Sequence, residues 1–226
     1  MLMKGAQVVV EILKREGADI IFGYPGGVAL PLYDALYDSG IRHILTRHEQ
    51  GAAHAADGFA RSSGKVGVCL STSGPGATNL VTGIATAYMD SSPTVFITSQ
   101  VTRNAIGKDS FQEADMRGIT TPITKHNYLI RSEKDLAPAL RQAFYVARTG
   151  RPGTVVVDIP KDLFEADIDV NFEEEIRMRG YKPLYAGDIK QVEAAADMIR
   201  KAKKPLFFVG GGMDTPDRAE IFAEIV

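Results

Sequence analysis

Apolar runs of strand length alternate with helical patterns along residues 1–165. Helical patterns, in which apolar residues recur every three or four positions, cover about 4–16, 30–38, 50–63, 77–90 and 133–148. Apolar strand runs lie near 19–23, 41–46, 66–71, 94–98, 126–130 and 154–159. This alternation predicts an α/β fold with a six-stranded, mostly parallel sheet and helices on both faces. The run 154–159 is the richest in β-branched residues, so it is predicted to be a central, fully buried strand.

The pattern changes after residue 165, and the sequence predicts three segments. Residues 1–165 form the first α/β domain. Residues 166–187 are first acidic and then mixed, show no period, and are interpreted as a linker. Residues 188–226 are interpreted as the beginning of a second α/β domain. Because Val226 falls inside an apolar helical pattern without a cap or partner strands, we expect the chain to be truncated.

Within the last segment, Asp188 and Gln191 have the spacing of a capping box and predict a helix that ends at about residue 202. The apolar run Leu206–Val209 predicts a strand, and a run of glycines follows it. Thr215–Pro216 then predicts the start of another helix.

Length and composition exclude several classes of protein. Of the 226 residues, 45% are hydrophobic and 24% are charged, which is typical of a globular α/β protein. The formal net charge of -2 and the lack of a basic run argue against a nucleic-acid partner, and no run is long enough to span a membrane. The lone cysteine, Cys69, is interpreted as buried packing. A helical pattern begins directly after Met-Leu-Met-Lys, which leaves no room for a signal peptide, so we expect a cytoplasmic location.

Three segments with polar or glycine-rich sequences (22–28, 47–58 and 71–79) each leave the carboxyl end of a predicted strand and enter a helix. Ligands of open parallel sheets bind at that edge, and glycine allows the backbone to approach them closely. Glu49 places a carboxylate at this edge, where it could contact a ligand. On position alone, however, a glutamate at the start of a helix more often serves only to interact with the helix dipole. The helix that follows Glu49 carries small residues that allow close packing: Gly51, Ala52, Ala53, Ala55 and Ala56.

Several segments together resemble the large subunit of acetohydroxyacid (acetolactate) synthase, at its amino-terminal pyrimidine-binding domain for thiamine diphosphate. The resemblance covers nearly the whole chain. The matching segments are 23–27, 47–57, 72–79, 111–113, 124–127 and 150–161. The individual motifs occur in several thiamine-diphosphate enzymes, but the combination of Phe111-Gln112-Glu113 with Pro160-Lys161-Asp162 is more specific to the synthase.

The resemblance implies a site for thiamine diphosphate. In that family a glutamate in a dry pocket shares a proton with N1′ of the cofactor's aminopyrimidine, so that the cofactor's own 4′-imino group can remove the proton from C2. Glu49 matches that glutamate. The other residues that match cofactor positions are Tyr24, Pro25, Gly26, Gly27, Thr72, Pro75, Asn79 and Gln112.

The implied reaction joins two 2-oxoacids, pyruvate and a second pyruvate or 2-oxobutyrate, in branched-chain amino-acid biosynthesis. Residues matching the substrate positions are Gly27, Val28, Phe111, Gln112 and Lys161, and Glu49, Gln112 and Lys161 match the catalytic positions. Without the resemblance, an ordinary core aromatic is the commoner role for a residue such as Phe111, and an exposed loop position is commoner for Lys161.

Arg151 matches a position that holds flavin adenine dinucleotide (FAD) in the family. A guanidinium suits a diphosphate, and the alternative is an arginine at the end of a helix that interacts with its dipole. The resemblance further implies a Mg²⁺ site in a carboxyl-terminal domain and most of an FAD site in a central domain, both largely absent here. No metal ligands are expected in this chain.

The resemblance also implies partners. Subunits of the family pair to build each active site, which predicts a homodimer or higher homo-oligomer and allows for a small regulatory subunit. Because this chain holds only the pyrimidine half of the site, we expect it to be inactive alone. An exposed apolar half-site is predicted, lined by Tyr24, Pro25, Val28, Ala52, Ala53 and Pro75.

Two other functions stay open: a related thiamine-diphosphate enzyme, such as a pyruvate oxidase or another carboligase, and a non-catalytic binding or assembly module. Ser99, Lys108 and Val28 depart from the family pattern, and Val28 makes the acceptor preference the least certain property. A zinc-protease motif is excluded because His48 and His54 lie six residues apart rather than four. The segment Gly74-x-Gly76 has Asn79 where a dinucleotide-binding fingerprint has its third glycine, which argues against a nicotinamide enzyme.

Overall fold

The computed structural model describes residues 1–213 and 216–226. Its contacts divide the chain into two compact units, Met1–Lys182 and Pro183–Val226. The first unit holds the sheet and its covering helices, and the described part of the second unit is mainly helical.

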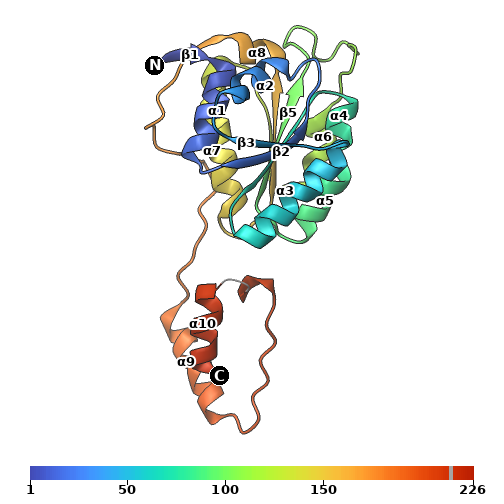
Figure 1. The fold of residues 1–226 in the computed structure, drawn as a ribbon. Coiled ribbons are helices and arrows are strands. Elements are labelled where there is room, and N and C mark those ends of the chain that lie inside the picture. The colour runs from blue at the N-terminus through green and yellow to red at the C-terminus, as the bar shows by residue number, and fades with distance from the viewer. Residues whose placement is uncertain (214–215) are drawn as a thin grey trace. The chain divides into compact units, whose positions relative to one another are not determined.

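A six-stranded parallel sheet forms the centre of the first unit (Figure 1), which confirms the predicted α/β fold. The strands in chain order are β2 (Ile20–Tyr24), β3 (Arg42–Leu45), β4 (Gly67–Ser71), β5 (Thr94–Gln100), β6 (His126–Leu129) and β7 (Thr154–Pro160). Their order across the sheet is β3-β2-β4-β5-β7-β6. Every residue of β7 is buried, and the strand lies inside the sheet with a partner on each side, as predicted. The chain runs from β5 to the edge strand β6 and returns to place β7 between them.

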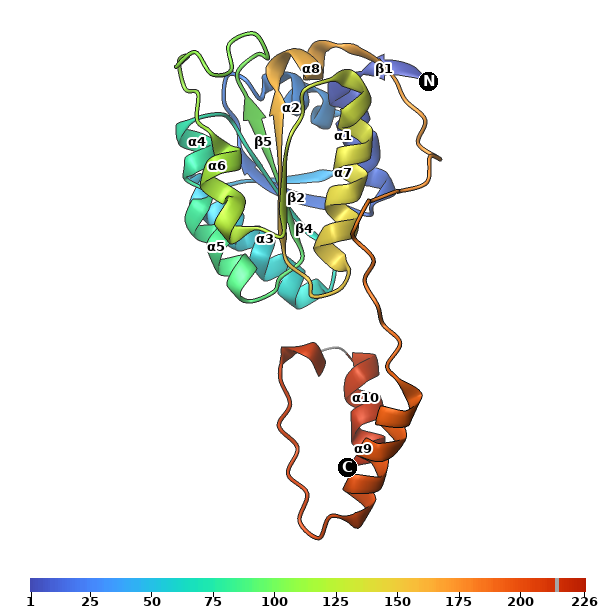
Figure 2. The same ribbon diagram turned by 180° about the vertical axis from the view of Figure 1, so that it is seen from behind.

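Helices cover both faces of this sheet (Figures 1 and 2). On one face, α1 (Gly5–Arg15) packs against α7 (Glu133–Arg148) and α2 (Leu30–Tyr37). On the other, α3 (Glu49–Ser63) packs against α5 (Val81–Met89), with α6 (Met116–Thr120) and the 3-10 turn η1 (Thr121–Ile123) beside them. Alternate residues of each strand point to opposite faces, so Val68 and Leu70 join the core under α1 and α7, whereas Cys69 joins the core under α3 and α5. Cys69 is therefore buried packing, as predicted.

The single helix predicted over 77–90 is wrong, because the structure has a short helix, α4 (Pro75–Thr78), before α5. The interruption lies at Asn79–Leu80. There the backbone N–H of Leu80 donates to the carbonyl of Ala77, three residues back rather than four. This tighter turn separates the two helices.

A small antiparallel sheet pairs β1 (Leu2–Lys4) with β8 (Asp167–Asp169). The strand β8 lies within 166–187, for which the sequence pattern predicts no element, because three residues are too few to show a period. The helix α8 (Lys161–Glu165) leads into it, and the backbone N–H of Gly5 donates to the carbonyl of Ala166 (2.9 Å). These contacts bring the start of α1 beside α8.

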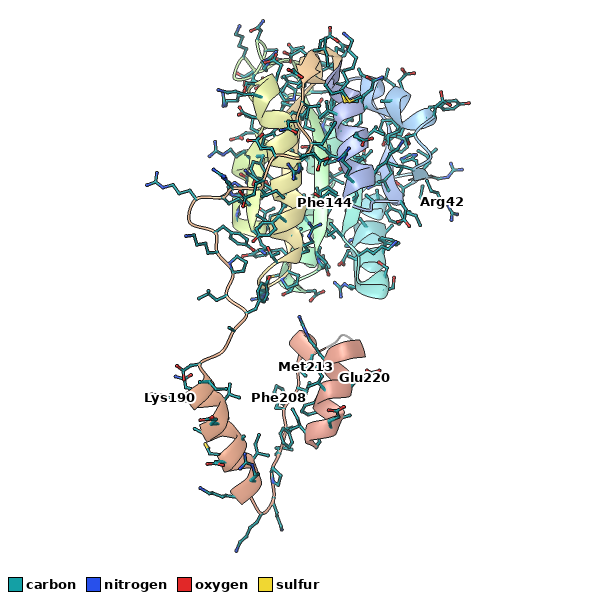
Figure 3. All side chains as sticks on the ribbon, turned by 90° about the vertical axis from the view of Figure 1, so that its left-hand side faces the viewer. Arg42, Phe144, Lys190, Phe208, Met213 and Glu220 are labelled. Atoms are coloured by element: carbon teal, nitrogen blue, oxygen red, sulfur yellow. The ribbon has the colours of Figure 1, made fainter. Side chains whose placement is uncertain are left out.

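The second unit contains α9 (Ile189–Lys201), the 3-10 turn η2 (Gly211–Met213) and α10 (Pro216–Ile225). Asp188 caps α9 by accepting a hydrogen bond from the backbone N–H of Gln191 (3.1 Å), which confirms the predicted helix start. The strand predicted at Leu206–Val209 is wrong, since these residues have no strand beside them in the described part of the unit. Phe208, labelled in Figure 3, is fully exposed. The predicted helix start at Thr215 lies outside the described residues.

Large apolar side chains from α1 and α7, such as Phe144 (labelled in Figure 3), fill the core of the first unit beneath one face of the sheet. Among the described residues, no helix combines the length and apolar character needed to cross a bilayer.

Candidate functional site

The three polar segments singled out from the sequence leave three neighbouring strands. Glu49 follows β3, the glycine turn at 23–27 follows β2, and the segment 72–79 follows β4. In the sheet, Gly23 pairs with Leu45 on one side, and Tyr24 pairs with Ser71 on the other. The chain moves outward from β2 to β3 and then crosses to β4 on the opposite side, so this edge is the switch point where open sheets bind ligands.

Glu49 is the first residue of α3 and is only 8% exposed. The amide Nδ2 of Asn79 donates to its Oε2 (2.9 Å), and the backbone of Gly76 approaches its Oε1 so closely that a Cβ there would lie 3.0 Å from the oxygen. His48 caps the helix by accepting a hydrogen bond from the backbone N–H of Gln50 through Nδ1 (3.1 Å). The carboxylate is thus held in one orientation, with one oxygen bound to Asn79.

Two glycines close around Thr72 beside this carboxylate. A Cβ on Gly26 would lie 2.5 Å from the Cβ of Thr72, and a Cβ on Gly76 would lie 2.6 Å from its Cγ2. Only glycine permits these approaches. Among the described residues the buried Oγ1 of Thr72 has no hydrogen-bond partner. A buried polar atom without a partner is costly, so this hydroxyl marks a place where a ligand could supply one.

The small residues of α3 serve the packing of this face. Ala52 and Ala53 are fully buried, and a Cβ on Gly83 of α5 would lie 2.3 Å from the Cβ of Ala53. The prediction that Ala52 and Ala53 line an exposed apolar half-site is therefore wrong, because both belong to the buried core and Ala53 packs against α5. Of the other residues predicted to line it, Tyr24 is 41% exposed, Pro25 and Val28 are partly exposed, and Pro75 is exposed.

The Phe111–Gln112 pair reaches the same edge from the long connection between β5 and α6. Gly74, at φ +55°, lies against Gln112, whose carbonyl oxygen would be 2.4 Å from a Cβ on that glycine. Gln112 itself has a φ of +58°, a conformation that a non-glycine residue adopts at a cost. Phe111 is 88% exposed, which excludes the alternative of a core aromatic.

Lys161 lies next to the glycine turn. It starts α8, and with Gly27 it lines a hollow of about 500 Å³ whose other residues are Leu30, Pro31, Tyr33, Asp34 and Glu165. Its Nζ lies 3.9 Å from Oε1 of Glu165, a loose contact that leaves the ammonium available to a ligand. The structure thus brings the residues predicted for cofactor and substrate to one edge, with Arg151 the exception.

Arg151 is at the other end of the sheet. Its Nε donates to Oγ of Ser91 (2.7 Å), and both residues come just before strands, β7 and β5, rather than after them. Parallel strands start at the same edge, so Arg151 lies opposite the edge that carries Glu49. Among the residues that the structure describes, no hydrogen bond joins Arg151 to the residues predicted to surround the pyrimidine.

Buried polar side chains beneath the site were missed from the sequence. Asp158 of β7 is 2% exposed and accepts hydrogen bonds from Oγ1 of Thr98 (2.6 Å) and Nε2 of Gln100 (2.9 Å). Burial, helped by the nearby carboxylate of Asp115, raises the pKa of Asp158 to about 7 against the two hydrogen bonds. The signal that could have identified it is a charged residue inside an otherwise apolar, β-branched run.

The parallel sheet, the glycine turns and the carboxylate at the switch point agree with a comparison to protein families. Residues 3–119 match the family described as thiamine pyrophosphate enzyme, N-terminal TPP binding domain. The chain belongs to this family.

Similarity to individual proteins extends beyond that domain. The chain is 54% identical to the probable acetolactate synthase large subunit of Methanocaldococcus jannaschii, over 93% of this chain and 36% of that protein. It is 52% identical to the acetolactate synthase large subunit of Corynebacterium glutamicum (98% and 36%), and 55% identical to the acetolactate synthase of Arthrospira platensis (92% and 37%). The chain therefore spans little more than a third of the length of these relatives.

Proposed function

We propose that this chain is the thiamine-diphosphate pyrimidine-binding part of an acetolactate synthase catalytic subunit. The reaction is the decarboxylation of pyruvate and its condensation with a second 2-oxoacid, in branched-chain amino-acid biosynthesis. The observation that carries the proposal is the Glu49 carboxylate, buried at the switch point and held by Asn79, in a chain similar to proteins of that name.

Glu49 is the residue proposed to hold a proton at N1′ of the aminopyrimidine. The fit is supported by its burial, by the unpartnered hydroxyl of Thr72, and by the close approach of the Gly26 and Gly76 backbones to Thr72 beside it. Tyr24, Pro25, Gly27, Pro75, Asn79 and Gln112 complete the proposed surroundings of the cofactor. When bound, thiamine diphosphate supplies the electron sink for the loss of carbon dioxide, while these residues orient it and exclude water.

Lys161, Phe111 and Gln112 are proposed to act on the substrate, with Gly27 and Val28 at the same place. The support is the hollow that Lys161 shares with Gly27. It places the ammonium group of Lys161 beside the glycine turn that also carries the proposed cofactor residues Tyr24, Pro25 and Gly26. A cation there favours the carboxylates of pyruvate and of the acceptor, pyruvate or 2-oxobutyrate. Val28, which is partly buried, is proposed to influence the choice of acceptor.

The remaining parts of the active protein are proposals that rest on the family. They are Mg²⁺ at the diphosphate, a structural FAD that Arg151 contacts, and a homodimer or higher homo-oligomer with a small regulatory subunit, in the cytoplasm. The position of Arg151, on the edge opposite Glu49, would separate the flavin contact from the pyrimidine site.

The substitution Glu49→Gln tests the central assignment, because it keeps the size of the side chain and the partner of Asn79 but removes the acid. In a preparation that binds thiamine diphosphate, exchange of the cofactor's C2 proton should slow by about a hundredfold or more. Glu173→Gln is the matched control, since Glu173 is an exposed glutamate that pairs with Arg15. Wild-type exchange in the Glu49 variant would refute the proposed role.

A further inference from the structure

The connection between β5 and α6, residues 101–115, carries Phe111 and Gln112 and is closed mainly on itself. The carboxylate of Glu113 accepts hydrogen bonds from the backbone N–H of Ser110 (3.0 Å) and of Gly107. Oγ of Ser110 donates to the carbonyl of Ala105 (2.7 Å). These bonds give the connection its own shape, but they do not determine where it lies relative to the rest of the site.

Arg103 attaches the start of this connection to two helices. Its backbone N–H donates to Oδ1 of Asp162 (3.0 Å) and its Nε to Oδ2 of the same carboxylate (2.6 Å). Its Nη2 donates to Oε1 of Glu133 at the start of α7 (2.8 Å), and Nη1 reaches the carbonyl of Arg131 (3.4 Å). One guanidinium thus joins the connection, α8 and the segment that enters α7.

The place of attachment on α8 is directly beside Lys161. Asp162 is the next residue, and α8 is secured independently by Leu163 and Phe164, which are fully buried. Loss of Arg103 would therefore release the start of the connection and leave α8 in place, while Gln112 keeps its contact with Gly74. The far end of the connection is held separately, where Nε2 of Gln100 donates to the carbonyl of Ala114 (2.8 Å).

We propose that Arg103 is a positioning residue, which through Asp162 holds the connection that carries Phe111 and Gln112 in a set relation to Lys161. The proposal rests on the proposed function, in which those three residues contact the substrate. Arg103 itself contacts none of the reacting groups. Arginine suits this role because its guanidinium has several N–H donors in a fixed plane, so it can bind the carboxylates of Asp162 and Glu133 together. The single ammonium of a lysine cannot reach both with the same geometry.

Mobility of the connection can be measured without any enzyme activity. The chain contains no tryptophan, so Phe111→Trp, at a side chain that is 88% exposed, places a single fluorescent reporter on the connection. In that background, Arg103→Ala should increase the amplitude of the fast component of the fluorescence anisotropy decay, and Arg103→Lys should have an intermediate effect. Arg61→Ala is the matched control, because Arg61 makes a comparable pair with Asp57 at the far end of α3.

Kinetics then test the effect on the substrate. In a preparation that forms acetolactate from pyruvate and retains Phe111, Arg103→Ala should raise the KM for pyruvate by about tenfold to a hundredfold while the affinity for thiamine diphosphate stays unchanged. Asp162→Asn, which keeps the shape of the side chain, should have a smaller effect of the same kind and serves if the Arg103 variant does not fold.

The outcomes separate this proposal from the proposed function. An anisotropy decay unaffected by both the Arg103 and Asp162 variants overturns the attachment. A more mobile connection with unchanged pyruvate kinetics overturns the positioning role. If the chain makes no acetolactate even when it is joined to the remaining domains found in its relatives, the proposed function fails. The anisotropy still decides whether Arg103 holds the connection.

Discussion

Asp158 allows a quantitative test of the buried polar groups beneath the candidate site. Its carboxyl group is 2% exposed, and Thr98 and Gln100 supply its two hydrogen bonds. Among the described residues it forms no ion pair, and the charged group that acts on it is the carboxylate of Asp115. Burial therefore raises its pKa from 3.8 to about 7.

The raised pKa makes the folding stability depend on pH in a defined direction. Between about pH 4 and pH 7 the folded chain keeps the proton on Asp158, whereas the unfolded chain loses it. The folded state binds more protons in this range, so the free energy of unfolding falls as the pH rises through it. At about 1.4 kcal/mol for each pH unit, the loss is on the order of 4 kcal/mol, a large part of a typical domain stability.

The substitution Asp158→Asn removes this dependence because asparagine is neutral at every pH. Its carbonyl oxygen can face Nε2 of Gln100 while its amide donates to Oγ1 of Thr98. Urea unfolding followed by circular dichroism, at pH values from 4 to 8, should show the variant gaining stability relative to the wild type as the pH rises, by on the order of 4 kcal/mol in total.

A surface carboxyl group supplies the control. A hydrogen bond from Lys65 lowers the pKa of Asp19, so the stability that this group contributes is fully present above about pH 4 and is lost only as the pH falls below that value. The curves for Asp19→Asn and the wild type should therefore run parallel from about pH 4 to pH 8. Parallel pH curves for the wild type and Asp158→Asn would mean that Asp158 is already ionised in the folded state, and the reasoning from burial would then be wrong.

Three other predictions concern the site and the core. Lys161→Ala should raise the KM for pyruvate and leave the affinity for thiamine diphosphate nearly unchanged; weaker cofactor binding with normal pyruvate kinetics would count against this. Gly76→Ala places a methyl group 2.6 Å from Cγ2 of Thr72 and 3.0 Å from Oε1 of Glu49, so it should displace these side chains and weaken cofactor binding by about tenfold or more. Gly51→Ala, which meets nothing within 4 Å, should not; equal calorimetric affinities of the two variants would contradict a cofactor site beside Thr72 and Glu49. Cys69 is fully buried, and burial raises its pKa, so a thiol reagent should label it only after unfolding; labelling at the rate of a free thiol would contradict that burial.

The location of the site could be predicted from the sequence to a large extent. Strand–helix alternation determines a parallel sheet, and parallel strands end at one edge, so glycine turns and a carboxylate that follow strands must come to that edge. The pairing of Glu49 with Asn79 could not be predicted in the same way. It depends on β2 lying between β3 and β4 and on the break between α4 and α5, which turns Asn79 toward the carboxylate.

Contacts between residues that are far apart in the sequence could not be predicted. Asp158 lies in a run that reads as an apolar strand, and its partners on β5 lie about sixty residues earlier in the chain. The pair of Arg103 and Asp162 has a similar separation. Residues so distant in sequence carry no local pattern that relates them.

The fold class, the strands and main helices of the first unit, and the edge at which the candidate site lies could all be predicted from the sequence. Hydrophobic period and turn residues are local properties, so they are visible without the fold. The order of the strands, the burial of Ala52 and Ala53 in the core, and the hydrogen bonds among the buried polar groups follow instead from the tertiary structure. These features depend on which surfaces meet, and that is settled by packing the whole domain at once.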